Sequence, residues 1–296
     1  MCLVLLSIAG SLVTLLVAFE GWYPKASPDG RFAISFLSIF VAVLAAAAVF
    51  QEYRYARKSR YAESLAYITQ VFTALMRRRP EQLGTIEEVT NVCRVVTNRL
   101  GRILSMVTGT RCSVCIKVIP LNDDSDRPRV ATLCRDDTSI ERETGRSPVE
   151  AWMSTLEDPD AIQHWINENT DFAEVLRRAG TPQFVYISNN LPSEPFYWNT
   201  SFKIYGDPRK TSIPFLRSLT WPLPYRSTVV APIGGRDTSG RYTLSGFLCV
   251  DSASRYVFSR RYDVPLITAA AESMYALISR YVDLANGLAS TEGEEQ

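Results

Sequence analysis

Residues 225–252 read YRSTVVAPIGGRDTSGRYTLSGFLCVDS, two apolar runs joined by a glycine-rich segment. The runs are rich in β-branched and aromatic residues, and the glycines favour a chain reversal, so the stretch predicts a hairpin of antiparallel strands. A helix is predicted directly afterwards, because Asp263 is a good capping residue and Pro265 falls in the first turn. The face of this helix that should pack on the sheet carries Leu266, Ala270, Met274, Leu277 and Tyr281.

Length and charge limit what this hairpin can belong to. The chain has 296 residues, 46% of them hydrophobic, and a formal net charge of +1. Such a length allows one or two domains with a substantial core. Basic residues are interleaved with acidic ones, whereas a nucleic-acid-binding surface concentrates positive charge. We therefore expect no nucleic-acid partner.

The six cysteines lie mostly among apolar neighbours, which favours a reducing compartment over a disulfide framework. Cys112 and Cys115 form a CxxC motif, but residues three apart in a strand point to opposite faces and do not share a metal ion. The only histidine, His164, lies in a run predicted to be helical, where we expect it at the surface or in packing. The sequence therefore predicts no metal site and no cofactor.

Two charge-free apolar runs at the N-terminus, residues 2–19 and 32–50, are each long enough to cross a bilayer as a helix. A cleaved signal peptide is the alternative for the first run, although the run lacks a basic start. Basic residues gather directly after the second run. The positive-inside rule then places the C-terminal part in the cytoplasm, in a multi-pass protein of the inner cell membrane whose partner is the lipid bilayer.

The chain is predicted to have four parts. A transmembrane hairpin over 1–50 continues into a helical connector over 51–80, followed by a soluble domain over 81–285 and a disordered acidic tail over 286–296. Apolar residues of the connector alternate in steps of four and three, as in a coiled-coil seam, so we expect a homodimer. This seam comprises Tyr61, Leu65, Ile68, Phe72 and Leu75.

Between the connector and the hairpin, the patterns predict one more helix, a two-stranded meander and a long irregular section. The irregular section holds four of the five tryptophans, and its prolines interrupt regular structure. The predicted elements are a helix over 86–107, strands over 111–120 and 130–134, helices over 149–156 and 160–178, and a strand over 183–187.

Several features of the C-terminal part recur together in one known family. They are Pro232 closing one strand, Gly246 opening the next, Asp251 and Ser252 after it, Phe258, and the Ala269–Glu272 part of the final helix. With the order of elements over 61–283, they resemble a GAF domain. The resemblance implies an α+β fold, with an antiparallel sheet of five or six strands, helices packed on one face and a ligand pocket on the other. In this chain the domain would follow two N-terminal transmembrane helices.

The same resemblance implies a small-molecule sensor whose irregular section covers the pocket. Aromatic side chains there would stack on a planar ligand, a nucleotide being one example, and an arginine at a strand end would meet an anionic group. Trp152 and Trp165 fit packing of amphipathic helices better than ligand contact. The candidate ligand-binding residues are Asn189, Asn190, Tyr197, Trp198, Arg226 and Phe247.

Motifs of several GAF relatives are missing. The sequence NKFDE, which accompanies cyclic-nucleotide binding, is absent, and no cysteine lies between Cys134 and Cys249, where bilin-binding and sulfoxide-reducing relatives use one. No catalytic constellation is evident, so we expect the chain not to be an enzyme. A redox enzyme that uses Cys134 or Cys249 is the catalytic alternative.

The sequence thus predicts a membrane-tethered cytosolic sensor that relays ligand binding through a helical bundle to the membrane or to a partner. One alternative is a membrane-disrupting effector, in which ligand-driven oligomerisation gathers the two-helix hairpins. Another is a structural dimer module that recruits partners.

Overall fold

The computed structural model describes residues 28–77, 79–119, 128–139, 164–178, 184–208, 214–236, 240 and 242–293. The chain divides into two compact units, residues 1–63 and residues 64–296. The helices are α2 (Pro28–Arg77), α3 (Ile86–Thr108), α5 (Thr170–Arg177), α6 (Phe202–Tyr205), α7 (Pro214–Leu219), α8 (Asp263–Ser273) and α9 (Tyr275–Gly293). The strands are β1 (Ser113–Val118), β2 (Ala131–Arg135), β3 (Tyr186–Ser188), β4 (Ser227–Arg236) and β5 (Tyr242–Ser252), and short 3-10 turns are η2 (Pro80–Gln82), η4 (Ile166–Glu168) and η5 (Leu191–Ser193).

Some predictions fall outside the described residues. They are the first apolar run over 2–19, the helix over 149–156 with Trp152, and the end of the acidic tail after Gly293. The middle of the glycine-rich reversal, residues 237–239, lies outside them as well.

Helix α2 contains the second apolar run. It is one helix of 50 residues, and large apolar side chains in it are exposed, Phe36 and Ile39 by 65% each. Within the described residues one helix is long and apolar enough to cross a membrane, over the stretch Ile39–Thr73. Two transmembrane helices at the N-terminus therefore stay a prediction.

The last part of α2 buries a side different from the predicted seam. Ser64 and Val71 are buried, whereas Leu65 is 61% exposed and Phe72 is partly buried. Moving from Leu65 to Ser64, or from Phe72 to Val71, turns the buried side by about 100° around the helix axis. The predicted seam is a contact between two copies of the chain, so burial within one copy leaves it a prediction.

Helix α3 begins and ends where the sequence predicts. The Thr85 hydroxyl accepts a hydrogen bond from the Glu88 N–H (3.2 Å), and the Glu88 carboxylate accepts one from the Thr85 N–H (3.3 Å). This capping box satisfies N–H groups that the first turn leaves without helical partners. Gly109 ends the helix in the left-handed region, at φ 74°, and its N–H donates to the Ser105 carbonyl.

Five strands form one antiparallel sheet in the order β2-β1-β5-β4-β3. β4 and β5 are the predicted hairpin, in which Ser227 pairs with Ser252. β1 lies against β5, and Gly246 permits their close approach, because a Cβ at that position would be 2.2 Å from the Lys117 carbonyl oxygen. The pairing of β1 with β2 shifts register between Ile116 and Lys117.

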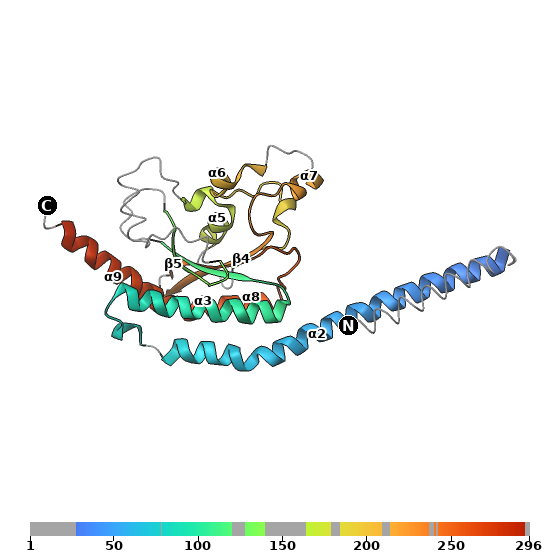
Figure 1. Cartoon of the computed structure of the whole chain (residues 1–296), viewed down its shortest axis with the longest axis horizontal. Helices are drawn as coiled ribbons and strands as arrows, with labels where there is room; N and C mark the ends of the chain where they lie inside the picture. Colours follow the sequence, from blue (N-terminus) through green and yellow to red (C-terminus); the bar gives the residue numbers. More distant parts are fainter. Residues whose placement is uncertain are drawn as a thin grey trace. The chain divides into compact units, whose positions relative to one another are not determined.

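The sheet has two differently covered faces (Figure 1). Helices α3 and α8 cover one, which we call the helical face, with α9 beside α3, and α5 lies on the other, the second face. This arrangement confirms the predicted α+β, GAF-like fold with helices on one face of an antiparallel sheet. The predicted closing helix is interrupted at Met274 into α8 and α9, and α9 continues to Gly293, past residue 286 where the tail was predicted. Of its predicted packing residues, Leu266 is partly buried, while the fully buried ones are Ala270, Met274, Leu277 and Tyr281.

The two CxxC thiols lie on opposite faces of the sheet, as predicted. The Cys112 thiol is 3.4 Å from the Thr108 hydroxyl of α3, whereas Cys115 belongs to the apolar cluster on the second face. All five described cysteines are free and buried. They therefore pack as small apolar residues.

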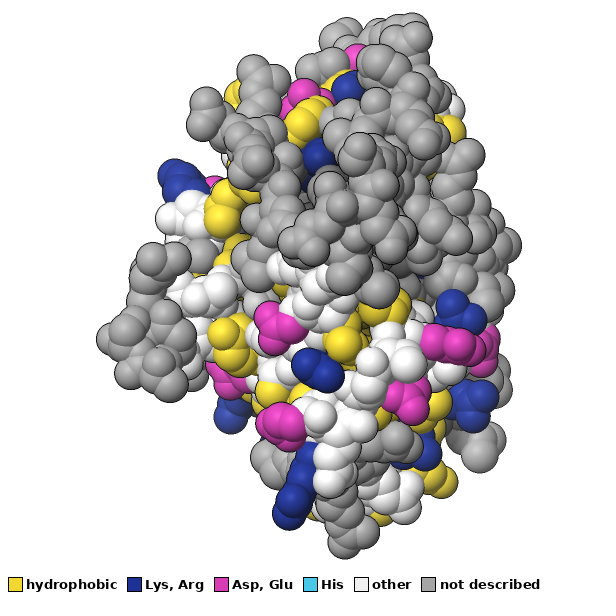
Figure 2. All heavy atoms as spheres, turned by 90° about the vertical axis from the view of Figure 1, so that its left-hand side faces the viewer, with side chains coloured by type: hydrophobic (Ala, Val, Ile, Leu, Met, Phe, Trp, Pro, Cys, Tyr) yellow, Lys and Arg dark blue, Asp and Glu magenta, His cyan; other side chains and the backbone are white. Residues whose placement is uncertain are grey.

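Charges of both signs are mixed at the surface. On the side of the molecule seen in Figure 2, Lys and Arg side chains of the described residues alternate with Asp and Glu and with apolar side chains. The interleaving of charges along the sequence is thus kept in space on the described part of this side.

Candidate functional site

The second face carries an apolar cluster between the sheet and α5. The rings of Phe172, from α5, and Phe247, from β5, have centroids 4.8 Å apart. Helix α5 presents this face to the sheet because Phe172 and Val175 are three residues apart and so lie on one side of the helix. The buried members are Cys115, Val130, Ile166, Phe172, Val175, Val230, Phe247 and Cys249.

A second, aromatic cluster adjoins it. Tyr197 lies at its centre, with ring centroids 6.1 Å from Phe202 and 6.2 Å from Trp221. The indole N–H of Trp221 donates to the Tyr225 carbonyl (2.7 Å), which fixes the orientation of this ring. We call this group the aromatic cluster; its buried members are Leu191, Tyr197, Phe202, Trp221 and Leu223.

Asp171 is a buried carboxyl group beneath the aromatic cluster. Burial raises its pKa to about 6, against the opposing effect of hydrogen bonds from the Phe172 N–H (2.9 Å) and the Tyr197 hydroxyl (3.1 Å). The Asn199 amide in turn donates to the hydroxyls of Tyr197 (3.3 Å) and Tyr225 (3.4 Å). A carboxyl group with a pKa near neutrality exchanges a proton within the physiological range.

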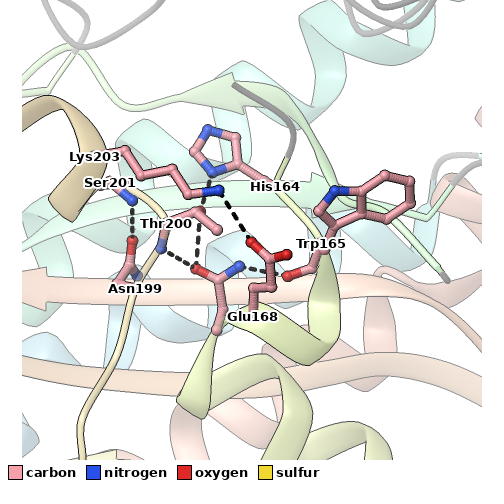
Figure 3. A network of polar contacts seen from close by, with 8 residues as sticks. His164, Trp165, Glu168, Asn199, Thr200, Ser201 and Lys203 are labelled. Atoms are coloured by element: carbon pink, nitrogen blue, oxygen red, sulfur yellow. Dashed lines mark hydrogen bonds and ion pairs between the residues drawn. The ribbon is translucent and has the colours of Figure 1, made fainter. Parts of the chain in front are cut away.

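A polar network lies at the edge of the sheet next to β2 (Figure 3). His164 Nδ1 is 2.5 Å from the Thr200 hydroxyl, and Asn169 accepts hydrogen bonds from the Thr200 N–H (3.0 Å) and hydroxyl (3.1 Å). The Lys203 ammonium is paired with the Glu168 carboxylate at 3.2 Å. The network joins the segment before α5 to the segment before α6.

His164 is neutral in this setting. Burial lowers the pKa of its imidazole to about 3, with the positive charges of Lys117, Arg135 and Lys203 adding to the effect. The predicted helix around His164 is wrong. The residue lies in an extended segment, because its carbonyl accepts from the Val130 N–H (3.0 Å) and Trp165 forms a bridge with Arg129. A helix starts only at Thr170, after η4.

Three of the sequence-predicted site residues lie in the apolar cluster under α5 or in the aromatic cluster. Tyr197 is at the centre of the aromatic cluster, and Phe247 is fully buried against α5. Trp198 is half-buried, its ring centroid is 5.4 Å from that of Phe202, and its N–H donates to the Thr170 hydroxyl. The structure thus brings these three to the second face.

The other three predicted residues lie at the end of β4. The Asn189 side chain donates to the Phe258 carbonyl (2.6 Å) and accepts from the Phe258 N–H (2.8 Å), so it holds the loop after β5. Asn190 donates to the hydroxyls of Ser193 (2.7 Å) and Tyr256 (2.9 Å). The backbone of Arg226 bonds to Leu191 and Ser252, and its side chain is half-buried. These three form no hydrogen bond to Asp171 or His164 among the contacts of the described residues.

Sequence reasoning missed Asp171 and Lys117 as site residues. Lys117 had a signal, because alternation in the strand SVCIKV places it on the same face as Cys115. Asp171 had none, since an acidic residue in the first turn of a helix is usually an exposed partner of the helix dipole. Within the described parts of the chain, no three His, Cys, Asp or Glu side chains gather as a metal site.

Comparisons with known proteins bear on the fold. No protein-family model and no curated protein sequence matches the chain. Similar solved structures include the GAF domain of a phosphoenolpyruvate-protein phosphotransferase from Acinetobacter, at 10% identity over 73% of this chain and 93% of that one, with a TM-score of 0.37. Two others are free methionine-R-sulfoxide reductases. That of Neisseria meningitidis is 10% identical over 74% of this chain and 92% of its own, with a TM-score of 0.38. The reductase of Thermoplasma acidophilum is 13% identical over 65% of this chain and 96% of its own, with a TM-score of 0.36.

The prediction that the chain is not an enzyme, which rested on the lack of an evident catalytic constellation, is contradicted by these similarities. Two of these similar structures are reductases, so a GAF-like architecture includes enzymes. Identities of 10–13% describe the fold alone and assign no activity to this chain.

Proposed function

We propose that this chain is a membrane-tethered sensor whose GAF-like domain binds a small ligand at the second face. The observation that carries the proposal is the buried carboxyl group of Asp171, with a pKa of about 6, beneath the aromatic cluster. Folding disfavours buried ionisable groups, and those with displaced pKa values concentrate at functional sites. The sequence resemblance to GAF domains also implies a ligand on the face away from the terminal helices.

The tether in this proposal is α2. One helix contains both the exposed apolar stretch and the connector, and Arg57, Lys58 and Arg60 follow the apolar stretch directly. With the first apolar run as a second transmembrane helix, these residues favour an inner-membrane protein with its C-terminal domain in the cytoplasm. A ligand that binds the domain more tightly in one arrangement of the connector than in another would shift the populations of the two arrangements.

The connector is also the proposed site of homodimer formation. Leu65 is 61% exposed, and Ile68 and Phe72 are only partly buried, so an apolar stripe of α2 remains accessible. Such a stripe can pack against the same stripe of a second copy. Two chains anchored in one membrane favour the parallel arrangement that this packing requires.

Calorimetry on the full chain in phospholipid nanodiscs, against a panel of nucleotides and small metabolites, tests the sensor. We expect at least one ligand to bind, and Asp171→Asn to weaken it about tenfold, because a hydrogen bond to a charged group contributes about 1.5–3 kcal/mol. Phe196→Ala, at a side chain that is 91% exposed, is the matched control and should bind normally. A panel without any binder would overturn the sensor.

Membrane attachment is tested separately by washing membranes with alkaline carbonate. The full chain should stay in the pellet, because bilayer-spanning helices resist extraction, and a chain lacking residues 1–50 should be released. Release of the full chain would contradict the tether and leave the ligand proposal standing.

A further inference from the structure

The hydrogen bonds around His164 fix the position of its proton (Figure 3). The Asn169 amide nitrogen donates to the Trp165 carbonyl at 2.6 Å, which makes the other amide atom, Oδ1, an acceptor. Oδ1 receives the Thr200 N–H at 3.0 Å and the Thr200 hydroxyl at 3.1 Å. The Thr200 hydroxyl has a single proton, and this contact uses it.

His164 must therefore be the donor in its own contact with Thr200. The distance from Nδ1 to the Thr200 hydroxyl is 2.5 Å, and a hydroxyl that already donates elsewhere accepts there. Nδ1 carries the proton of the neutral imidazole, and Nε2 carries a lone pair. None of the hydrogen bonds among the described residues uses Nε2.

A lysine lies on the same face of the sheet as His164. The Val130 N–H donates to the His164 carbonyl, so the His164 segment extends the sheet beyond β2, and paired side chains share a face. Thr132 is two residues after Val130 and so has the same orientation. Lys117 pairs with Thr132 across β1 and β2, and its ammonium donates to the Thr132 hydroxyl at 3.1 Å.

The Lys117 charge acts on the Asp171 carboxyl group, whose pKa it lowers, but the two groups form no ion pair. The Lys117 ammonium lies 5.8 Å from the centroid of the Phe172 ring and forms no ion pair with a described carboxylate. Lys203 differs, because Glu168 holds its ammonium. Within the described part of the second face, the Lys117 ammonium and the fixed hydrogen-bond acceptor of His164 thus lie near a further positive charge, that of Arg135.

We propose that Lys117 and His164 form a binding site for a protonated oxyanion, namely hydrogen phosphate or the monoanionic form of a phosphate monoester. The Lys117 ammonium takes the negative charge, and His164 Nε2 accepts the proton of the P–OH group. This inference rests on the proposed ligand-binding function and gives its ligand a chemical class. Sulfate has the same shape and charge as hydrogen phosphate but no proton to donate, so the lone pair of Nε2 repels it.

The test uses the fact that His164 is the only histidine of the chain, so labelled histidine gives one imidazole signal. The full chain in phosphatidylcholine nanodiscs, with 15N-labelled histidine, is titrated with inorganic phosphate, glycerol phosphate and sulfate, and compared in nanodiscs containing phosphatidic acid. We expect phosphate or a phosphate monoester to shift the Nε2 resonance. Its affinity should be at least about tenfold above that of sulfate, because sulfate cannot form the hydrogen bond to Nε2.

The arms separate the sources of the phosphate group. A response to soluble phosphates assigns the site to a dissolved ligand, and a response confined to phosphatidic acid nanodiscs assigns it to a lipid headgroup; both support the proposal. Equal binding of sulfate, or no response of Nε2 to any phosphate, would overturn it. If another ligand binds in calorimetry without moving the Nε2 signal, the phosphate site fails while the sensor proposal survives.

Two variants complete the test. Lys117→Met should weaken phosphate binding at least about tenfold, whereas Lys203→Gln, at a neighbouring cation already paired with Glu168, should change it less than about twofold. Thermal unfolding of both variants shows whether they are folded. Equal losses in two folded variants would mean that general positive charge, and not Lys117, binds the anion.

Discussion

The two faces of the sheet bury different kinds of groups. The helical face, under α3 and α8, buries aliphatic side chains such as Ile116 and Leu248, which are 0% exposed. The second face combines an apolar cluster with a buried carboxyl group, Asp171, and a neutral imidazole, His164. Apolar burial dominates the helical face, where the buried Asp136 accepts a hydrogen bond from the Val114 N–H (3.1 Å), whereas the second face keeps a carboxyl group and an imidazole in set protonation states at a cost in folding free energy.

The largest expected effects come from two neighbouring residues of β5 that point to opposite faces. Phe247→Ala should lower the free energy of unfolding by about 3–5 kcal/mol and Leu248→Ala by about 2–5 kcal/mol, because both side chains are fully buried and leave cavities. Urea unfolding measures both losses. Phe196→Ala is the control and should change stability by less than about 0.5 kcal/mol. A loss below about 1 kcal/mol for Phe247→Ala would mean that the second face is loosely packed.

The next effect concerns pH. The folded-state pKa of Asp171, about 6, lies above the ordinary value of 3.8, so the folded protein binds more protons than the unfolded chain between these values. The stability that Asp171 contributes is therefore lost as pH rises through the folded pKa, by about 2 kcal/mol from about pH 4.5 to about pH 7. Asp171→Asn should remove this loss, as seen in urea unfolding at the two pH values.

His164 supplies the opposite sign for the same experiment. Its folded-state pKa, about 3, lies below the ordinary 6.5, so its contribution to stability grows as pH rises between these values. His164→Gln should therefore make stability fall more steeply as pH rises, whereas Asp171→Asn should make it rise. If the free energy of unfolding of both variants depended on pH in the same way as that of the parent chain, neither group would be shielded from water.

The smallest effect compares two tyrosine hydroxyls. The Tyr197 hydroxyl, on the second face, donates to Asp171, whereas the Tyr281 hydroxyl, on α9, is buried without a hydrogen-bond partner among the described residues. Tyr197→Phe should lower the free energy of unfolding by about 1–2 kcal/mol, and Tyr281→Phe should raise it by about 1 kcal/mol. Thermal unfolding distinguishes them; equal signs would show that the two hydroxyls do not differ in pairing.

Local signals made much of the fold predictable. The hairpin of β4 and β5 follows from alternation and a glycine-rich reversal, and α3 follows from apolar periodicity with Gly109 at its end. The interruption of the closing helix at Met274 carries no such signal. Periodicity continues through it, because Ala270, Met274 and Leu277 are all buried.

The site was predictable only in part. Aromatic enrichment pointed to Tyr197 and to the irregular section. The protonation states of Asp171 and His164 depend on partners far along the chain, since Tyr197 is 26 residues from Asp171 and Thr200 is 36 from His164. Burial and hydrogen bonding of that kind arise from tertiary contacts, which periodicity does not encode.

Because of the register shift between Ile116 and Lys117, residues of β2 that are two apart point to different faces of the sheet. Thr132 pairs with Lys117 and Cys134 with Ile116, so two residues that a regular strand would align on one side face opposite ways. Length, more than composition, is therefore the sensitive property of this edge. Deleting Leu133 would remove the extra residue and leave Thr132 opposite Lys117, because Thr132 and Cys134 would then be neighbours on opposite faces. Inserting one residue between Thr132 and Leu133 would instead turn Thr132 away from Lys117, although every contacting side chain would still be present in the chain. Related sequences that keep this site should thus tolerate substitutions in β2 far better than such an insertion.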